Sequence, residues 1–160
     1  MINYKKPLIA AVDGTAIGGG ATILLHFDAI FISPNAKVKY PFSDLGLAPE
    51  VGSSLLLFQS LGYQKSAQVL FGAEWISGKE YFDFGMAKYL GEDYYGKAID
   101  YAHQLNEQSL ASIMETKAIL KSFNADALSA ARDLETKAMK RLYGSEDNIK
   151  AIEKFFSRKG

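Results

Sequence analysis

The chain has 160 residues, of which 48% are hydrophobic, 12% aromatic and 22% charged, the size and composition of one folded domain rather than of a disordered segment. Lysine plus arginine and aspartate plus glutamate each total 18, so the formal net charge is zero, and the sequence contains no cysteine. A balanced charge disfavours nucleic acid or an anionic membrane as a partner, and the lack of cysteine excludes disulfides, thiol nucleophiles and cysteine-ligated metals.

The first forty residues predict a small sheet with one short helix. The apolar run Leu8–Val12 is typical of a central strand that is buried on both faces. Residues 28–33 and 37–40 predict two further strands. Between the first two strands, Ala21–His26 contains no helix breaker and predicts a short buried helix, which follows three consecutive glycines, Gly18–Gly20.

The remaining residues predict helices. Residues 41–54 are loop-like because prolines and glycines interrupt any period, and a helical apolar pattern resumes over Leu55–Leu61 and closes at Gly62. Everything after Tyr63 has a helical pattern. We therefore divide the chain into a sheet-containing part, residues 1–62, and a helical part with oligomerisation helices, residues 63–160. The clearest apolar stripes are Ala98, Ile99, Ala102 and Leu105; Leu110, Ile113 and Met114; Leu128, Ala131, Leu134, Ala138 and Leu142; and Ile149, Ile152, Phe155 and Phe156.

Neither membrane insertion nor secretion is predicted. The most apolar stretch, Ala21–Ile32, is too short to cross a bilayer and contains His26 and Asp28. Residues 1–7 lack the succession of charged, apolar and small residues that marks a secretory signal. We therefore expect a cytoplasmic protein.

The glycine run is the first candidate site. Glycines at a strand-to-helix junction let backbone amides approach a ligand at the positive end of a helix. The spacing of Gly14, Gly18, Gly19 and Gly20 does not match the dinucleotide motif G-x-G-x-x-G, and no Gly-Lys-Ser or Gly-Lys-Thr sequence follows. Two interpretations remain: an oxyanion hole, or close packing of a helix on a strand without any ligand.

Glu50 is the second candidate, because it lies in an apolar loop between Pro49 and Val51. Apolar surroundings desolvate the charged form of a carboxylate, which suits a general base working near neutral pH. The alternative is a surface glutamate near the positive start of the following helix.

The histidines and the adjacent serines do not form further candidate sites. His26 and His103 are isolated, so no metal site is predicted. The adjacent serines at 53 and 54 lack a G-x-S-x-G motif and indicate a helix start.

Three segments together, Lys6–Gly14, Ala16–Gly20 and Asp28–Phe31, resemble the crotonase (enoyl-CoA hydratase/isomerase) superfamily in order and spacing. The resemblance implies an α/β fold, a crotonase-like (ClpP/crotonase) spiral ββα core followed by an all-helical C-terminal region. Members of the family are longer, so the core is expected to be incomplete at the front, where the family has one oxyanion amide and much of its coenzyme A surface. The resemblance continues through Pro41–Glu50, Leu70–Gly72, Ile76–Glu80, Phe84–Ala87 and Ser145–Phe155.

The resemblance also implies an activity. Hydratases of this family place two glutamates around the reacting water, but the matching positions here are Thr22 and Phe42. The Pro-Phe-Ser-x-Leu-Gly-x-x-Pro-Glu pattern is instead similar to that of the 3,2-enoyl-CoA isomerases, whose single base matches Glu50, and the oxyanion amide of the glycine run matches Gly19. We therefore expect an enoyl-CoA isomerase that shifts the double bond of 3-enoyl-CoA thioesters to the 2-enoyl position.

Further expectations follow from the same resemblance. The substrate is an acyl-CoA thioester, and no separate cofactor is expected because coenzyme A is part of that substrate. The family forms trimers or paired trimers, so a homotrimer or hexamer is implied. Two alternatives stay open: a non-catalytic, truncated binding or assembly module, and another crotonase reaction such as hydration, thioester hydrolysis or dehalogenation. The expected substrate-binding residues are Gly18, Gly20, Phe42, Leu47, Val51 and Leu56.

Overall fold

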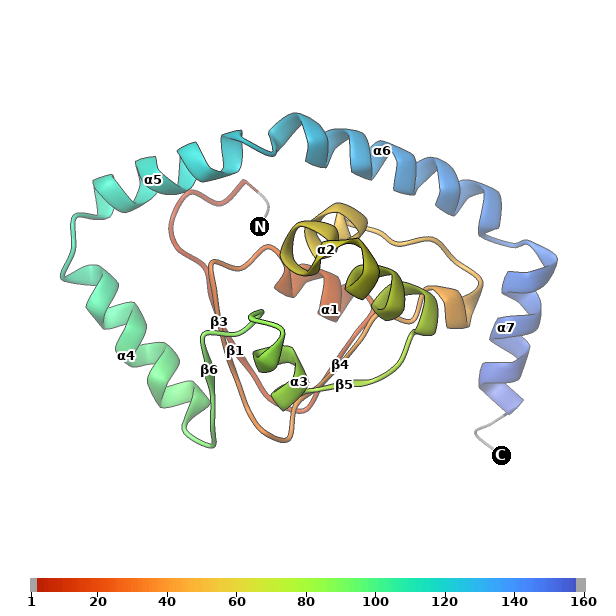
Figure 1. The fold of residues 1–160 in the computed structure, drawn as a ribbon, viewed down its shortest axis with the longest axis horizontal. Helices are drawn as coiled ribbons and strands as arrows, with labels where there is room; N and C mark the ends of the chain where they lie inside the picture. Colours follow the sequence, from red (N-terminus) through yellow and green to blue (C-terminus); the bar gives the residue numbers. More distant parts are fainter. Residues whose placement is uncertain (1–2, 158–160) are drawn as a thin grey trace.

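The computed structural model describes residues 3–157, and these residues form two three-stranded sheets with helices around them (Figure 1). The first sheet has the order β1-β3-β6 and is parallel, and the second has the order β2-β4-β5, with only β5 antiparallel. The first four strands therefore alternate between the two sheets. The strands are β1 (Ile9–Val12), β2 (Thr15–Ile17), β3 (Ala29–Ile32), β4 (Lys37–Lys39), β5 (Ile76–Ser77) and β6 (Tyr89–Leu90).

The last four helices form an arch around the sheets and the helices α1, α2 and α3 (Figure 1). Within this arrangement α4 packs on β1 and β3, α6 packs on α2, and α7 packs on η1. Within residues 3–157, no helix is long and apolar enough to cross a membrane. The helices are α1 (Gly19–Leu24), η1 (Ser43–Leu45), α2 (Ser53–Gly72), α3 (Gly78–Asp83), α4 (Tyr94–Asn106), α5 (Leu110–Ser122), α6 (Ala125–Leu142) and α7 (Glu146–Ser157).

The hydrophobic core lies between the sheets and the helices α1, α2 and α3. On β3 the side chains of Ile30, Phe31 and Ile32 are all buried, as expected for a parallel strand with neighbours on both edges. The core cluster consists of Ala10, Val12, Ala21, Leu24, Ile30, Ile32, Ala36, Val38, Tyr40, Phe42, Leu57, Val69, Ile76 and Tyr81.

The sheet differs from the sequence prediction in three respects. The run Leu8–Val12 was expected to be a central strand buried on both faces, but Ala11 is exposed and β1 is at the edge of its sheet. Strand β2 was not predicted, because it spans only three residues between a turn and the glycine run. Strands β5 and β6 lie in the part expected to be helical throughout, and two residues are too few for an alternating pattern to be recognised. The remaining C-terminal region is helical as predicted.

Helix α2 is longer than its sequence pattern indicated. The pattern was expected to close at Gly62, and Gly62 does interrupt the helix, with φ 73° and ψ 173°. The chain then resumes a helical conformation as far as Gly72. The division between residues 1–62 and 63–160 therefore lies inside α2, at the break between its two segments, and stays a prediction.

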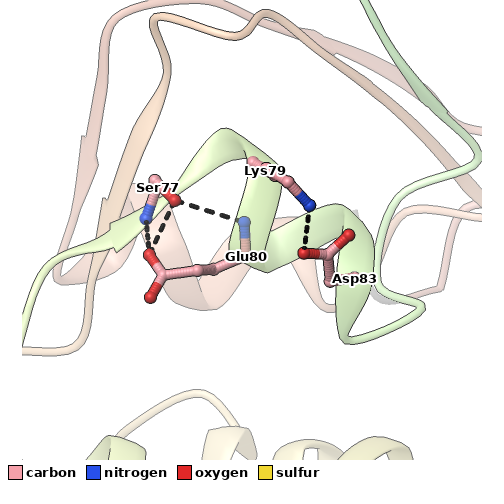
Figure 2. A network of polar contacts seen from close by, with 4 residues as sticks. All are labelled: Ser77, Lys79, Glu80 and Asp83. Atoms are coloured by element: carbon pink, nitrogen blue, oxygen red, sulfur yellow. Dashed lines mark hydrogen bonds and ion pairs between the residues drawn. The ribbon is translucent and has the colours of Figure 1, made fainter.

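The start of α3 is fixed by a reciprocal pair of hydrogen bonds (Figure 2). The backbone N–H of Glu80 donates to Ser77 Oγ at 3.2 Å, and the backbone N–H of Ser77 donates to Glu80 Oε2 at 2.8 Å. The Ser77 hydroxyl also donates to Glu80 Oε2 at 2.6 Å. The hydrogen bonds from Ser77 lower the pKa of the Glu80 carboxyl group. This capping box fixes the first turn of α3.

Candidate active site

Gly18 forms the junction between β2 and α1. Its φ of 55° and ψ of −120° lie in a region that residues with a Cβ rarely occupy. Its N–H donates to the Lys39 carbonyl at 3.0 Å, and its carbonyl accepts from the N–H groups of Ala21 and Thr22, both at 2.9 Å. The backbone of Gly18 therefore connects β4 to the first turn of α1 and fixes where that helix begins.

Gly19 and Gly20, the first two residues of α1, have backbone N–H groups that a ligand could reach. Gly19 and Gly20 are exposed, and among residues 3–157 no acceptor is found for their N–H groups. The first N–H groups of a helix have no intrahelical acceptor, so such groups can donate to a ligand. The carbonyl of Gly19 accepts from Thr22 Oγ1 at 3.1 Å, which holds this peptide in the helical conformation. An oxygen atom that gains negative charge could accept a hydrogen bond here.

Glu50 lies beside Gly19, although the two residues are far apart in the sequence. Glu50 is half-buried in the loop between η1 and α2, and its Oε1 atom lies 3.6 Å from the position that a Cβ would occupy on Gly19. The fold therefore places a carboxylate beside a glycine whose backbone N–H has no acceptor among residues 3–157. This is the pairing that proton transfer next to a carbonyl requires.

The loop that carries Glu50 has an unusual backbone. Val51 and Gly52 adopt φ values of 59° and 78°, and the N–H of Ser53 donates to the Glu50 carbonyl at 3.0 Å. His26 Nε2 lies 2.8 Å from the Val51 carbonyl oxygen, and because a carbonyl can only accept, Nε2 carries the proton. Burial lowers the pKa of His26, which favours the neutral form of the ring. His26 therefore has a structural contact, as its isolation in the sequence indicated.

A second carboxylate, Glu135 of α6, contacts the same segment. Glu135 is buried, with 6% of its surface exposed. Its Oε2 accepts from the N–H of Gly52 at 2.7 Å, and its Oε1 accepts from the N–H and the hydroxyl of Ser54 at 2.9 and 2.6 Å. The prediction that residues 53 and 54 begin a helix is confirmed, since α2 starts at Ser53. Sequence reasoning missed Glu135, which lies 83 residues from Gly52 and has no local motif.

The surroundings of Glu50 are more polar than its neighbours in the sequence indicate. A cavity of about 310 Å³ adjoins the Glu50 loop, and helix α6 forms its other wall. The apolar surroundings expected for Glu50 are therefore found only among its neighbours in the sequence, whereas the cavity beside it also has charged side chains. The cavity is lined by Pro49, Glu50, Val51, Arg132, Glu135, Thr136, Met139 and Lys140.

The apolar side chains predicted to bind the substrate differ in how far they are buried. Phe42 is buried in the hydrophobic core, whereas Leu47, Val51 and Leu56 are half-buried. The structure thus brings Glu50 to Gly19, and the assignment of these four apolar side chains to an acyl pocket stays a prediction. Gly18 lines a separate cavity of about 390 Å³ together with Ile17, Pro41, Asp44, Leu45, Ala151 and Lys154.

Comparisons with known proteins place this geometry in a family. The family model for enoyl-CoA hydratase/isomerase matches residues 1–160. The chain is 28% identical to enoyl-CoA delta isomerase 2 of Rattus norvegicus, over 99% of this chain and 41% of that protein. It is also 28% identical to a protein named probable enoyl-CoA hydratase from Bacillus subtilis, over 98% of this chain and 62% of that protein. The chain therefore spans less than two thirds of either relative.

A solved structure gives the same result for the fold. The crystal structure of an enoyl-CoA hydratase/isomerase from Pseudoalteromonas atlantica T6c matches with a TM-score of 0.93 and 26% identity. The match covers 98% of this chain and 64% of that one. The crotonase-like α/β fold with a helical C-terminal region, which the sequence resemblance implied, is confirmed.

Proposed function

The chain belongs to the enoyl-CoA hydratase/isomerase family, and we propose that within this family it shifts the double bond of 3-enoyl-CoA thioesters to the 2-enoyl position. The observation that carries the proposal is the proximity of Glu50 to Gly19: Glu50 Oε1 lies 3.6 Å from the position that a Cβ would occupy on Gly19. One group can move a proton, and the other can stabilise the charge that this proton leaves behind.

The reaction needs one proton carrier and one hydrogen-bond donor. The Glu50 carboxylate takes a proton from C2 of the 3-enoyl thioester, the electron pair of that C–H bond forms the C1–C2 double bond of a dienolate, and the carbonyl electron pair moves to the thioester oxygen. The Gly19 N–H donates to the thioester oxygen, where negative charge develops. The protonated Glu50 then returns its proton to C4, which leaves the double bond between C2 and C3 and restores the carboxylate.

The residues at the two positions that hold glutamates in hydratases favour isomerisation over hydration. Thr22 is buried and uses its hydroxyl to bond the Gly19 carbonyl, and Phe42 is buried in the core. Neither can act as an acid or a base toward water. With Glu50 as the carboxylate beside Gly19, the arrangement suits a reaction in which one group both removes and returns the proton.

The substrate and the assembly are part of the same proposal. The substrate is an acyl-CoA thioester, which brings coenzyme A with it, so no separate cofactor takes part. Self-association into a trimer or a hexamer is supported by large apolar side chains that the helices leave exposed. These include Phe58, Tyr63 and Phe71 on α2, Ile119 and Leu120 on α5, Phe123 after α5, and Leu134 on α6.

The same exposed side chains favour a second candidate function, a non-catalytic assembly module that keeps the helical surface without turnover. An absorbance assay separates the candidates, because a conjugated 2-enoyl thioester absorbs in the ultraviolet and a 3-enoyl thioester does not. The isomerase proposal predicts rising absorbance with 3-enoyl-CoA. Falling absorbance with 2-enoyl-CoA would show hydration instead, and a folded, oligomeric chain without either change would favour the assembly module.

A further inference from the structure

Glu135 supplies the start of α2 with an acceptor that its own sequence lacks. The residue before the helix is Gly52, which has no side chain, and the first turn of α2 contains no acidic residue. The N–H groups at a helix start need acceptors and favour a negative charge. Glu135 provides both from another helix, and within residues 3–157 the hydrogen bonds that it accepts come from Gly52 and Ser54.

The backbone held in this way is the one that carries the base. Val51 has φ 59°, in the left-handed region that a β-branched residue rarely adopts. Such a conformation persists only when contacts around it fix the chain. His26 holds the Val51 carbonyl from one side, and Glu135 holds the next N–H, that of Gly52, from the other. Gly52 also lies so close to α6 that an added Cβ would meet Leu128 Cδ1 at 2.3 Å.

We infer that Glu135 is a positioning residue for Glu50: by fixing Gly52 and Ser54 it keeps Val51 in its left-handed conformation and the Glu50 carboxylate directed at Gly19. This inference rests on the proposed function, in which Glu50 is the base. Without the hydrogen bonds that Glu135 accepts, the peptide after Val51 is held on the His26 side only, and relaxation of φ at Val51 turns the neighbouring Glu50 away from Gly19. A displacement of about 1 Å is enough to lower a rate by two orders of magnitude.

The test uses three variants of the full chain. Glu135→Gln keeps the shape of the side chain but removes the charge and places an NH₂ group against one of the N–H donors. Glu135→Ala removes all three hydrogen bonds. The control is Asp133→Asn, which removes one negative charge from an exposed position two residues away on the same helix. Thermal unfolding shows whether each variant folds.

Two measurements follow Glu50 itself. The first is the turnover of 3-enoyl-CoA: for Glu135→Gln we expect kcat to fall about 10- to 100-fold while KM changes less than about twofold, because the substrate contacts remain. The second is the ¹³C resonance of the Glu50 carboxyl group, together with amide exchange. We expect this resonance to move, and the amides of Gly52 and Ser54 to exchange faster. Asp133→Asn should match the wild type in all of these.

The outcomes separate this inference from the proposed function. A folded Glu135→Gln variant with unchanged kcat and an unmoved Glu50 resonance would overturn the inference, and a lower unfolding midpoint with unchanged kcat would reduce Glu135 to a purely structural role. If the wild-type chain does not turn over 3-enoyl-CoA, the proposed function fails. The Glu50 resonance then still decides whether Glu135 positions that carboxylate.

Discussion

A methyl group on Gly19 would lie 3.6 Å from Oε1 of Glu50, so the carboxylate of the loop before α2 lies directly beside the first residue of α1. The contact joins a half-buried carboxylate to a backbone amide without an acceptor among residues 3–157. Neither group is unusual by itself. Together they form a site at which a proton can be moved and the resulting charge stabilised.

A Gly19→Ala variant tests this contact without disturbing the backbone. The φ of Gly19 is not in the left-handed region, and 3.6 Å is an ordinary van der Waals distance. We expect stability to be unchanged or raised by about 0.4–1 kcal/mol, because alanine lowers the entropy of the unfolded chain. Turnover should fall about tenfold or more, because the methyl group occupies the space between the carboxylate and the entering substrate. Thermal unfolding and the absorbance assay measure the two effects.

Gly20→Ala is the matched variant for stability. Its added methyl group would meet nothing within 4 Å, and the position is also in α1. It should show a similar change in unfolding midpoint and a smaller loss of turnover than Gly19→Ala. Equal losses of turnover in the two variants would mean that α1 as a whole, rather than the contact with Glu50, was perturbed.

A Gly52→Ala variant tests the packing of α6 on the start of α2. The added methyl group would lie 2.3 Å from Leu128 Cδ1, and φ at this position is +78°. We expect a loss of about 1–3 kcal/mol in the free energy of unfolding, from backbone strain and overpacking together. Urea denaturation measures it.

A double-mutant cycle with Leu128→Ala separates the two causes. Removing the Leu128 side chain should relieve the steric part of the Gly52→Ala defect and leave the part due to φ. Strict additivity of the two substitutions would contradict the close approach of α6 to Gly52.

His26 predicts how stability depends on pH. Burial lowers its pKa in the folded chain below the ordinary value of 6.5, and the positive charges of Lys121 and Arg132 lower it further. Between these two pKa values the unfolded chain binds a proton that the folded chain does not, so the stability from neutral His26 is complete above pH 6.5 and is lost as the pH falls below it. Unfolding midpoints measured from pH 7.5 to pH 5 should therefore decrease on acidification.

The control for this pH dependence removes each histidine in turn. His26→Gln should be less stable at pH 7.5, because the Val51 carbonyl loses its donor, and it should have a flatter profile. His103→Gln removes the same kind of side chain from an exposed position on α4 and should keep the profile of the wild type. A steep profile in His26→Gln would assign the pH dependence to another group.

The sequence predicted those features that depend on neighbouring residues. The capping box joins Ser77 to Glu80, only three positions later in the sequence, and could be recognised directly. Glu50 and Gly19 were each identified from their local patterns and from the family resemblance. Their contact could not be derived from spacing, because it depends on how the loop before α2 folds back over α1.

Features that depend on distant segments were not predictable. Glu135 is one of several charged residues on a long amphipathic helix, and only the packing of α6 on α2 buries it. Lys117 of α5 is similar: it is buried and bonds Asp28 at 2.6 Å, 89 residues away. The edge position of β1 also depends on tertiary pairing, which an apolar run of five residues does not specify.

The most direct test of the account is the rate at which the chain conjugates a 3-enoyl-CoA thioester, compared with the rate of Glu50→Gln. Glu107→Gln, an exposed position after α4, is the matched control. The account predicts that Glu50→Gln folds normally and loses turnover at least about 100-fold, the usual contribution of a general acid or base, while Glu107→Gln keeps it. A folded Glu50→Gln variant with full turnover would contradict the account and remove Glu50 from the reaction.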